Sequence, residues 1–236
     1  MTKLVLFDID GTLVLTGRAG IRAMNRACEE VIGHPNALNG IAVAGRTDWS
    51  ILHDALGAIG HELDEALFTR LRETYVGRLT EEIDAPAEGV KAVMPGIRPL
   101  LDMLEARPDV FLGLLTGNFE QSARIKLEHF DLWRYFRCGA FGDDAADRNA
   151  LVPFAVERAR RCGLDTAALE AIFVIGDTPH DVACARAGGA VPIAVATGTF
   201  GVHQLRASGA DIVFADLSDT EAVLGVMGLS VRNLGS

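Results

Sequence analysis

The sequence predicts an α/β fold, a doubly wound parallel sheet with an inserted α-helical cap domain. Short, continuous apolar runs recur along the chain and are typical of strands that helices cover on both faces. Segments with apolar residues at helical spacing alternate with these runs, as in doubly wound sheets. Residues 16–88 break the alternation, because they contain three successive helical patterns and no convincing strand.

Several apolar runs are candidate strands, since they are too continuous to be half-exposed and too short to be helices. The clearest are residues 4–7, 111–115, 172–175 and 191–195, and weaker candidates lie near 137–141 and 212–214. Helical spacing between them is carried by Ile97, Leu100, Leu101 and Leu104, by Ile125, Leu127 and Phe130, and by Leu151, Phe154, Ala155 and Ala159. The strands and helices therefore alternate as the fold class requires.

The inserted segment is expected to be a helical cap, with residues 1–15 and 89–236 forming the α/β core and residues 16–88 the cap. Apolar residues on one face mark its first and last helices: Ile21, Met24, Cys28 and Val31, then Leu63, Leu67, Leu71, Tyr75 and Leu79. Gly and Pro at 15–17 and 85–89 predict the hinges where the chain leaves and re-enters the core.

The composition excludes several classes of protein. With 32 acidic against 22 basic residues, the net charge is −10 and no dense basic block is present, so a nucleic acid partner is not expected. No window approaches the roughly 20 apolar residues of a membrane span. The cysteines are far apart and form no CxxC pair, which argues against a zinc site or a disulfide scaffold: Cys28, Cys138, Cys162 and Cys184. We expect a cytoplasmic monomer or homodimer.

Two carboxylates, Asp8 and Asp10, directly follow the first predicted strand. Open α/β sheets bind ligands beyond the carboxyl ends of their strands. Side chains two residues apart point the same way and repel unless a cation lies between them or one is protonated, and Mg²⁺ suits such oxygen ligands. A solvated turn or a calcium-binding loop is the alternative, but the loop needs a Glu at its twelfth position, where this chain has Ala19.

Polar residues also follow two further predicted strands. Asp177 and Asp181 lie in a Gly-Asp-x-x-x-Asp sequence after the strand at 172–175. Thr116, Gly117 and Asn118 follow the strand at 111–115 and offer a hydroxyl and backbone N–H groups suited to phosphoryl oxygens. Because parallel strands end at one edge of their sheet, we expect these residues to form one constellation with Asp8 and Asp10.

The three motifs, in this order, resemble those of the haloacid dehalogenase superfamily. They are an apolar strand with Asp-x-Asp-Gly-Thr, an apolar strand with Thr, and Gly-Asp-x-x-x-Asp, and they span residues 4–195. The helical cap is similar to that of phosphoglycolate phosphatase-like members. The resemblance implies a magnesium-dependent phosphoric monoester hydrolase acting on a small phosphorylated metabolite, with 2-phosphoglycolate or a sugar phosphate as the expected substrate.

The resemblance also implies a role for each residue. Asp8 would be the nucleophile that forms an aspartyl-phosphate, and Asp10 the general acid and base. Asp10 favours ester hydrolysis over dehalogenation, since a halide leaving group needs no proton. The metal would be held by the Asp8 carboxylate, the Asp10 backbone carbonyl and Asp177, with Asp181 as a supporting anchor. Phosphate would be bound by Thr116, Gly117 and Asn118.

The family usually has a lysine between its third and fourth strands that faces the nucleophile and phosphate. This chain has lysines only at positions 3, 91 and 126. Arg148 is therefore the expected substitute, with Arg124 and Lys126 as alternatives. In the cap, the sequence Gly45-Arg46-Thr47-Asp48 resembles a substrate-facing loop, which makes Arg46 a candidate specificity residue.

Two other activities remain compatible with these motifs. A β-phosphoglucomutase-like phosphomutase uses the same core and transfers the phosphoryl group to a second sugar hydroxyl. A non-catalytic phosphoacceptor module, resembling response-regulator receivers, also places Asp and Thr at strand ends. The helical insertion and the length of 236 residues argue against the receiver.

Overall fold

The computed structural model describes residues 1–86 and 89–229, and these contain a parallel sheet of six strands in the order β5-β4-β1-β6-β7-β8. The strands are β1 (Thr2–Phe7), β4 (Val110–Leu115), β5 (Gly139–Ala140), β6 (Leu169–Gly176), β7 (Val191–Val195) and β8 (Ile212–Phe214). The predicted α/β fold with a helical insertion is confirmed. The candidate strand at 137–141 is shorter than expected, with only two residues paired to β4.

Strand β1 lies at the centre of the sheet, and its side chains are buried on both faces. Leu4 and Leu6 face one layer of helices, while Val5 and Phe7 face the other, and all four are 0% exposed. The layer on Val5 and Phe7 contains α4 (Ile97–Glu105), α5 (Glu120–His129) and α9 (Thr220–Val226). The opposite layer contains α6 (Leu151–Arg161) and α7 (Pro179–Ala187), and α8 (Val202–Ala207) packs beside β7 and β8.

One residue of the predicted helical pattern does not belong to the core. Phe154 is 43% exposed, whereas Leu151, Ala155 and Ala159 are buried as expected. On a helix, positions 151, 155 and 159 lie on one face and position 154 lies to its side. Val152 takes the remaining buried position of α6.

A short antiparallel pair that the sequence did not reveal joins the core to the cap. Strand β2 (Val14–Thr16) pairs with β3 (Lys91–Val93). Three residues are too few to show an alternating pattern in the sequence. The predicted hinge at 15–17 overlaps β2, and the predicted hinge at 85–89 includes residues 87–88, which lie outside the described residues.

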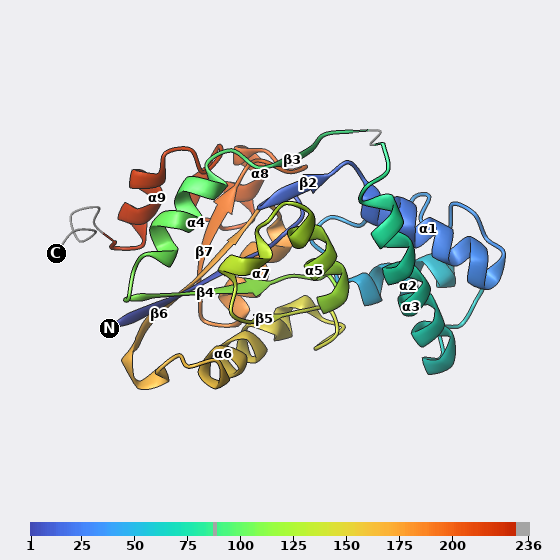
Figure 1. The fold of residues 1–236 in the computed structure, drawn as a ribbon, viewed down its shortest axis with the longest axis horizontal. Coiled ribbons are helices and arrows are strands. Elements are labelled where there is room, and N and C mark those ends of the chain that lie inside the picture. Colours follow the sequence, from blue (N-terminus) through green and yellow to red (C-terminus); the bar gives the residue numbers. More distant parts are fainter. Residues whose placement is uncertain (87–88, 230–236) are drawn as a thin grey trace.

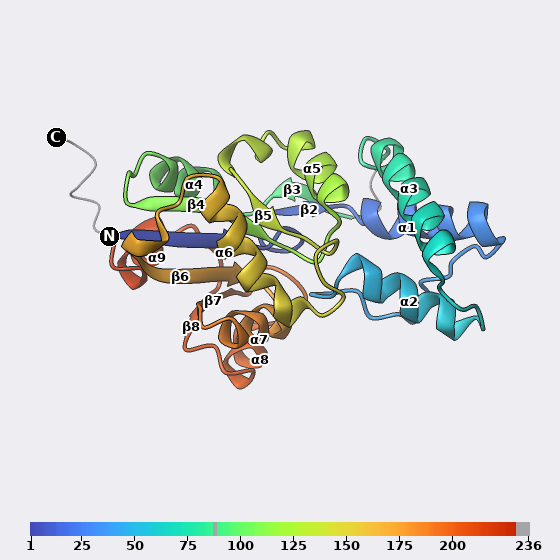
Figure 2. The ribbon, with the colours of Figure 1, turned by 90° about the horizontal axis from the view of Figure 1, so that it is seen from below.

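The cap contains α1 (Ala19–Ile32), α2 (Asp48–Ala58) and α3 (Glu65–Glu82). Figures 1 and 2 show these helices together at one end of the molecule, with the N-terminus at the opposite end. The predicted faces of α1 and α3 contact each other through Met24, Cys28, Leu71, Tyr75 and Leu79. The domain boundaries at residues 15/16 and 88/89 stay a prediction.

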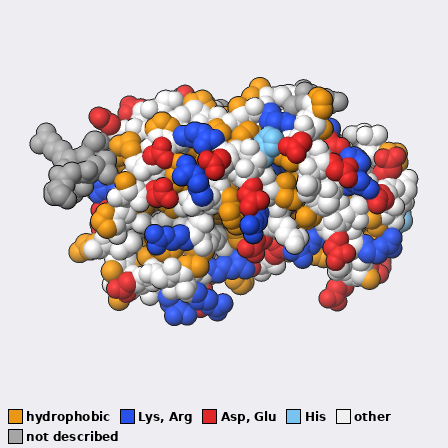
Figure 3. Space-filling view, viewed as in Figure 1, with side chains coloured by type: hydrophobic (Ala, Val, Ile, Leu, Met, Phe, Trp, Pro, Cys, Tyr) orange, Lys and Arg blue, Asp and Glu red, His pale blue; other side chains and the backbone are white. Residues whose placement is uncertain are grey.

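The surface in Figure 3 carries acidic and basic side chains side by side over both core and cap. Within residues 1–86 and 89–229, no helix is both long and apolar enough to cross a membrane.

Candidate active site

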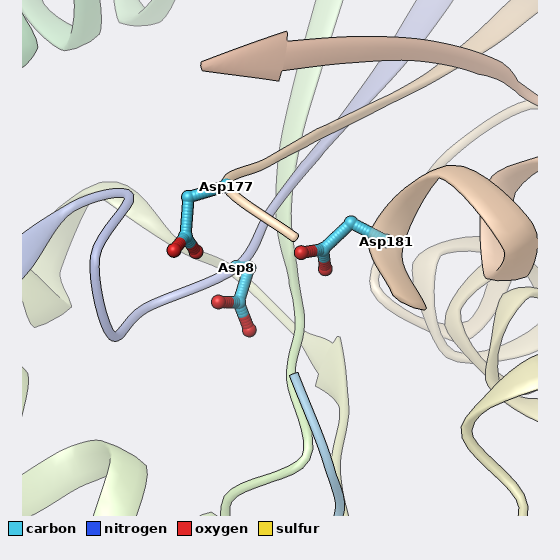
Figure 4. Close-up of side chains that lie close together, drawn as sticks. All are labelled: Asp8, Asp177 and Asp181. Carbon is cyan, nitrogen blue, oxygen red and sulfur yellow. The ribbon is translucent and has the colours of Figure 1, made fainter. Parts of the chain in front are cut away.

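Three buried carboxylates converge beyond the carboxyl ends of the central strands (Figure 4). Asp8 follows β1, Asp177 follows β6, and Asp181 lies in the first turn of α7. The pairing of Phe7 with Ile175 brings the ends of β1 and β6 together. One carboxylate oxygen from each of the three Asp residues lies within 4.8 Å of the others. The predicted convergence of two strand ends is therefore present in the structure.

The glycine and threonine after Asp10 fit closely around Asp177. Gly11 has a φ of 85°, and a Cβ at this position would lie 2.5 Å from Asp177 Oδ2. Only glycine adopts this conformation without strain and leaves room for the carboxylate. Thr12 is fully buried and its hydroxyl donates to Asp177 Oδ1 at 3.2 Å. The Gly-Thr pair therefore fixes the Asp177 side chain.

Burial and mutual repulsion disfavour the ionised form of this cluster. Burial raises the pKa of Asp8 to about 6, although the adjacent Arg148 acts in the opposite direction. Burial, followed by repulsion from Asp181 and Asp8, also raises the pKa of Asp177. A divalent cation removes this cost, because its charge favours the ionised carboxylates. The oxygen-rich cluster thus has the chemistry of a site for a hard metal ion.

Arg148 is the cation that faces Asp8. Its Nη2 donates to Asp8 Oδ1 at 2.9 Å and also contacts Asp181 Oδ1, while Nη1 donates to the Gly45 carbonyl at 3.1 Å. The side chain is buried, and Asp181 and Asp8 raise the pKa of Arg148 even though burial alone lowers it. Arg148 therefore stays charged beside the expected nucleophile.

Asp10 lies in a different network from Asp8. Its Oδ2 accepts hydrogen bonds from Lys126 Nζ at 2.6 Å and from Asn118 Nδ2 at 2.9 Å. Lys126 also donates to Asn118 Oδ1 at 2.6 Å, and Asn118 Nδ2 contacts Thr116 Oγ1 at 2.7 Å. The Asn118 side chain thus links Thr116, Asp10 and Lys126. The sequence offered Lys126 only as an alternative to Arg148, whereas the structure has both cations in place, Arg148 on Asp8 and Asp181 and Lys126 on Asp10.

The predicted specificity residue Arg46 lines the cavity between cap and core, but its guanidinium is held within the cap. It forms an ion pair with Asp54 at 2.8 Å and donates to the backbone oxygens of Ala42 and Ser50. Its role in specificity stays a prediction.

Asp48 is a buried carboxylate of the cap and ends the sequence Gly45-Arg46-Thr47-Asp48, in which only Arg46 was a predicted site residue. Its Oδ2 accepts hydrogen bonds from the backbone N–H of Phe119 at 2.9 Å and the Ser122 hydroxyl at 3.1 Å, both in the core. Burial raises the pKa of Asp48 to about 6, with Lys126 acting in the opposite direction. In the sequence, Asp48 follows the helix-capping Thr47, and an acidic residue there has an ordinary local explanation.

The loop before α2 is docked on the core beside these networks. Asp48 N donates to the Gly117 carbonyl at 2.7 Å, and the Thr47 hydroxyl donates to the Ala146 carbonyl at 3.0 Å. A Cβ on Gly117 would lie 2.1 Å from the Arg46 carbonyl oxygen, so only glycine permits this approach. The residues predicted to bind phosphate therefore contact the cap directly.

Phe119 also joins the core and the cap. It follows the Thr116-Gly117-Asn118 turn, is fully buried, and packs in the apolar cluster of the cap. Its ring lies 5.7 Å from that of Phe68 and 6.2 Å from that of Tyr75, with the Arg72 guanidinium 5.3 Å from its centroid. The loop after β4 is thus shared between the core site and the cap.

Residues 5–195 match the model of one protein family, described as haloacid dehalogenase-like hydrolase. The chain belongs to this family. The haloacid dehalogenase-like hydrolases are enzymes, and the chain is accordingly a hydrolase. The match includes every site residue described above.

Several relatives have similar length. Phosphoglycolate phosphatase from Rhodospirillum rubrum is 32% identical over 231 residues, which cover 95% of this chain and 92% of the relative. Probable phosphatase IndB from Dickeya dadantii is 27% identical, and the match covers 93% of this chain and 92% of the relative.

Among solved structures, a predicted phosphoglycolate phosphatase from Haemophilus somnus has a TM-score of 0.67 at 21% identity, covering 96% of this chain and 98% of that chain. CbbY from Rhodobacter sphaeroides in complex with phosphate has a TM-score of 0.65 at 20% identity, covering 97% and 99%. These two structures show the shared fold.

Proposed function

We propose that the protein is a magnesium-dependent phosphatase that hydrolyses a phosphate monoester of a small metabolite through an aspartyl-phosphate on Asp8. The observation that carries the proposal is the position of the Asp8 carboxylate. It contacts the Arg148 guanidinium, lies beside the carboxylates of Asp177 and Asp181, and lines the cavity beneath the cap. The 32% identity to a phosphoglycolate phosphatase supports a phosphate ester as the substrate.

The side chains present fit a magnesium ion. The cluster supplies hard oxygen atoms, and burial and mutual repulsion raise the pKa values of Asp8 and Asp177, a cost that a divalent ion would remove. Asp8, the Asp10 backbone carbonyl and Asp177 would hold the ion. Asp181 would support it, since its Oδ2 already accepts two hydrogen bonds from Thr178. Bound magnesium would screen the negative charge of the nucleophile from that of the phosphate.

In the first step, a carboxylate oxygen of Asp8 attacks phosphorus and the bond from phosphorus to the ester oxygen breaks. The Asp10 carboxyl group gives its proton to the departing alcohol oxygen. Arg148 stabilises the negative charge on the phosphoryl oxygens. Among the described residues, its buried Nε has no hydrogen-bond partner.

In the second step, water attacks phosphorus and the bond between phosphorus and the Asp8 oxygen breaks. Asp10 accepts the proton from the water, which returns both carboxyl groups to their starting states and releases inorganic phosphate. Asp10 is suited to both transfers because its carboxylate faces the cavity, 45% exposed, while Lys126 and Asn118 fix its orientation.

The test is the release of inorganic phosphate from a panel of phosphate monoesters with Mg²⁺. Turnover that EDTA stops and added Mg²⁺ restores is the expected result. Stable phosphorylation of Asp8 without turnover would indicate a phosphoacceptor module instead. Transfer of phosphate between two hydroxyls of a sugar, without its release, would indicate a phosphomutase.

A further inference from the structure

The cavity above the carboxylates is larger and more apolar than a two-carbon or sugar phosphate requires. Its volume is about 500 Å³, which lies in the range of pockets that bind drug-sized ligands. Asp8, Thr116 and Arg148 line its core side. Apolar side chains from the cap also line it, namely Ile21, Met24, Leu38, Val43 and Ile51, together with Tyr75.

The cavity has this volume although the cap is already docked on the core. The Thr47 hydroxyl bonds to the Ala146 carbonyl, and Asp48 bonds through both its backbone and its side chain to the turn after β4. Gly117 leaves no room for a closer approach of the Arg46 carbonyl at this point. The size of the cavity therefore cannot be attributed to a cap that has swung away from the site.

The cationic groups along the cavity wall are largely engaged by protein partners. Lys126 is held by Asp10 and Asn118, and the Arg46 guanidinium is held by Asp54 and backbone oxygens. Arg18 lines the exposed edge, where water screens its charge. A glycolate carboxylate or a ring of sugar hydroxyls placed against the apolar wall would lose hydrogen bonds to water without replacing them.

We propose that the alcohol part of the substrate is apolar, so that the preferred phosphate monoester carries a branched-alkyl or aryl-alkyl group. This inference rests on the proposed phosphatase function and narrows its substrate class. The phosphate contacts the core residues while the apolar group packs on Val43, Ile51 and Tyr75. Each methylene that fits such a pocket changes kcat/KM by roughly 10-fold or more.

The experiment compares three alkyl esters with Mg²⁺: 2-phenylethyl phosphate, glycerol 3-phosphate and 2-phosphoglycolate. All three are phosphate esters of primary alcohols, so the comparison reports mainly on the pocket. We expect kcat/KM for 2-phenylethyl phosphate to exceed both other values by at least about 10-fold. An equal or higher value for either polar ester would overturn this inference and leave the phosphatase function standing. Absence of phosphate release from all three would count against both.

A matched pair of cap variants tests the apolar wall itself. Val43 is half-buried and lines the cavity, whereas Val76 is half-buried in the same cap cluster but does not line it. Val43→Thr should lower the ratio of kcat/KM for 2-phenylethyl phosphate to that for glycerol 3-phosphate by about 5-fold or more, on the scale of adding one hydroxyl to an apolar contact. Val76→Thr should leave this ratio unchanged. The same ratio in both variants would contradict the proposal.

Discussion

Arg148 Nη2 lies 2.9 Å from Asp8 Oδ1, and the same nitrogen contacts Asp181. The chain has no lysine after position 126, and that Arg148 replaces the lysine expected from the family resemblance stays a prediction. Arg148 lies in the short 3₁₀ turn Arg148–Ala150, and its side chain reaches Asp8 at the end of β1. One cation therefore neutralises both the expected nucleophile and its acidic neighbour.

Arg148→Ala should lower kcat by at least about 10²-fold, the usual loss when an electrostatic stabiliser is removed. Arg148→Lys should retain part of this activity, because it keeps the charge but loses the second donor. Steady-state kinetics with a saturating ester measures both values. Circular dichroism is the necessary control, since removal of Arg148 leaves Asp8 and Asp181 buried without their partner. A folded Arg148→Ala variant with wild-type kcat would rule out this role.

Lys126→Met should lower kcat by about 10-fold or more for an alkyl phosphate and less for p-nitrophenyl phosphate. Lys126 orients the Asp10 carboxyl group, and a nitrophenolate leaving group needs little help from a proton donor. Arg124→Met is the matched control on the same helix, because Arg124 is exposed and its guanidinium contacts Glu128 and the ring of Trp133. Equal losses for both esters would show that Lys126 does not act through Asp10.

Gly117→Ala should impair activity by disturbing the contact between cap and core. The added methyl group would lie 2.1 Å from the Arg46 carbonyl oxygen, so the cap loop must move. We expect KM to rise and kcat to fall, each by several-fold. Gly57→Ala is the control, since its added methyl group meets no atom within 4 Å and lies within α2, where alanine favours the helix by about 1 kcal/mol. Unchanged kinetics in Gly117→Ala would contradict this account of cap docking.

Asp48→Asn should change how stability depends on pH in the metal-free protein. Burial raises the pKa of Asp48 from its usual 3.8 to about 6. Between these values the folded state binds more protons than the unfolded state, so the contribution of Asp48 to stability is present below pH 4 and is lost as the pH rises through 6. Relative to Asp48→Asn, the free energy of unfolding of the wild type should therefore fall by roughly 2–3 kcal/mol across this window. Urea unfolding of both proteins at pH 4 and pH 7 measures the difference, and a constant difference would show that the pKa of Asp48 is not raised in the folded state.

The parts of the site predicted from the sequence are those that follow strands. Asp8 and Asp177 each come directly after a continuous apolar run, and parallel strands bring such positions together without further information. The core strands were predictable for the same reason, because buried parallel strands are apolar throughout. Arg148 was predicted from the family resemblance and the absence of a later lysine.

The contacts made by helices and loops could not be predicted in this way. Lys126 lies on α5, where its spacing gives no sign that it reaches Asp10. Asp48 and Phe119 follow local patterns of a helix start and a turn, and their meeting depends on how the cap sits on the core. The strands β2 and β3 contain three residues each, too few for any pattern. Tertiary packing decides all of these features.

We infer that Asp8 carries the phosphoryl group during turnover. Rapid acid quench of the wild type with Mg²⁺ and a ³²P-labelled phosphate ester measures label on the protein. In a parallel quenched sample with unlabelled ester, tritiated borohydride reduces the acyl phosphate and expels phosphate, and peptide mapping of the tritium locates the modified residue. We expect ³²P label on the quenched wild-type protein and a reduced side chain at residue 8, and neither label nor phosphate release in a folded Asp8→Asn variant. Phosphate release by Asp8→Asn at the wild-type rate, or label on another residue, would contradict it.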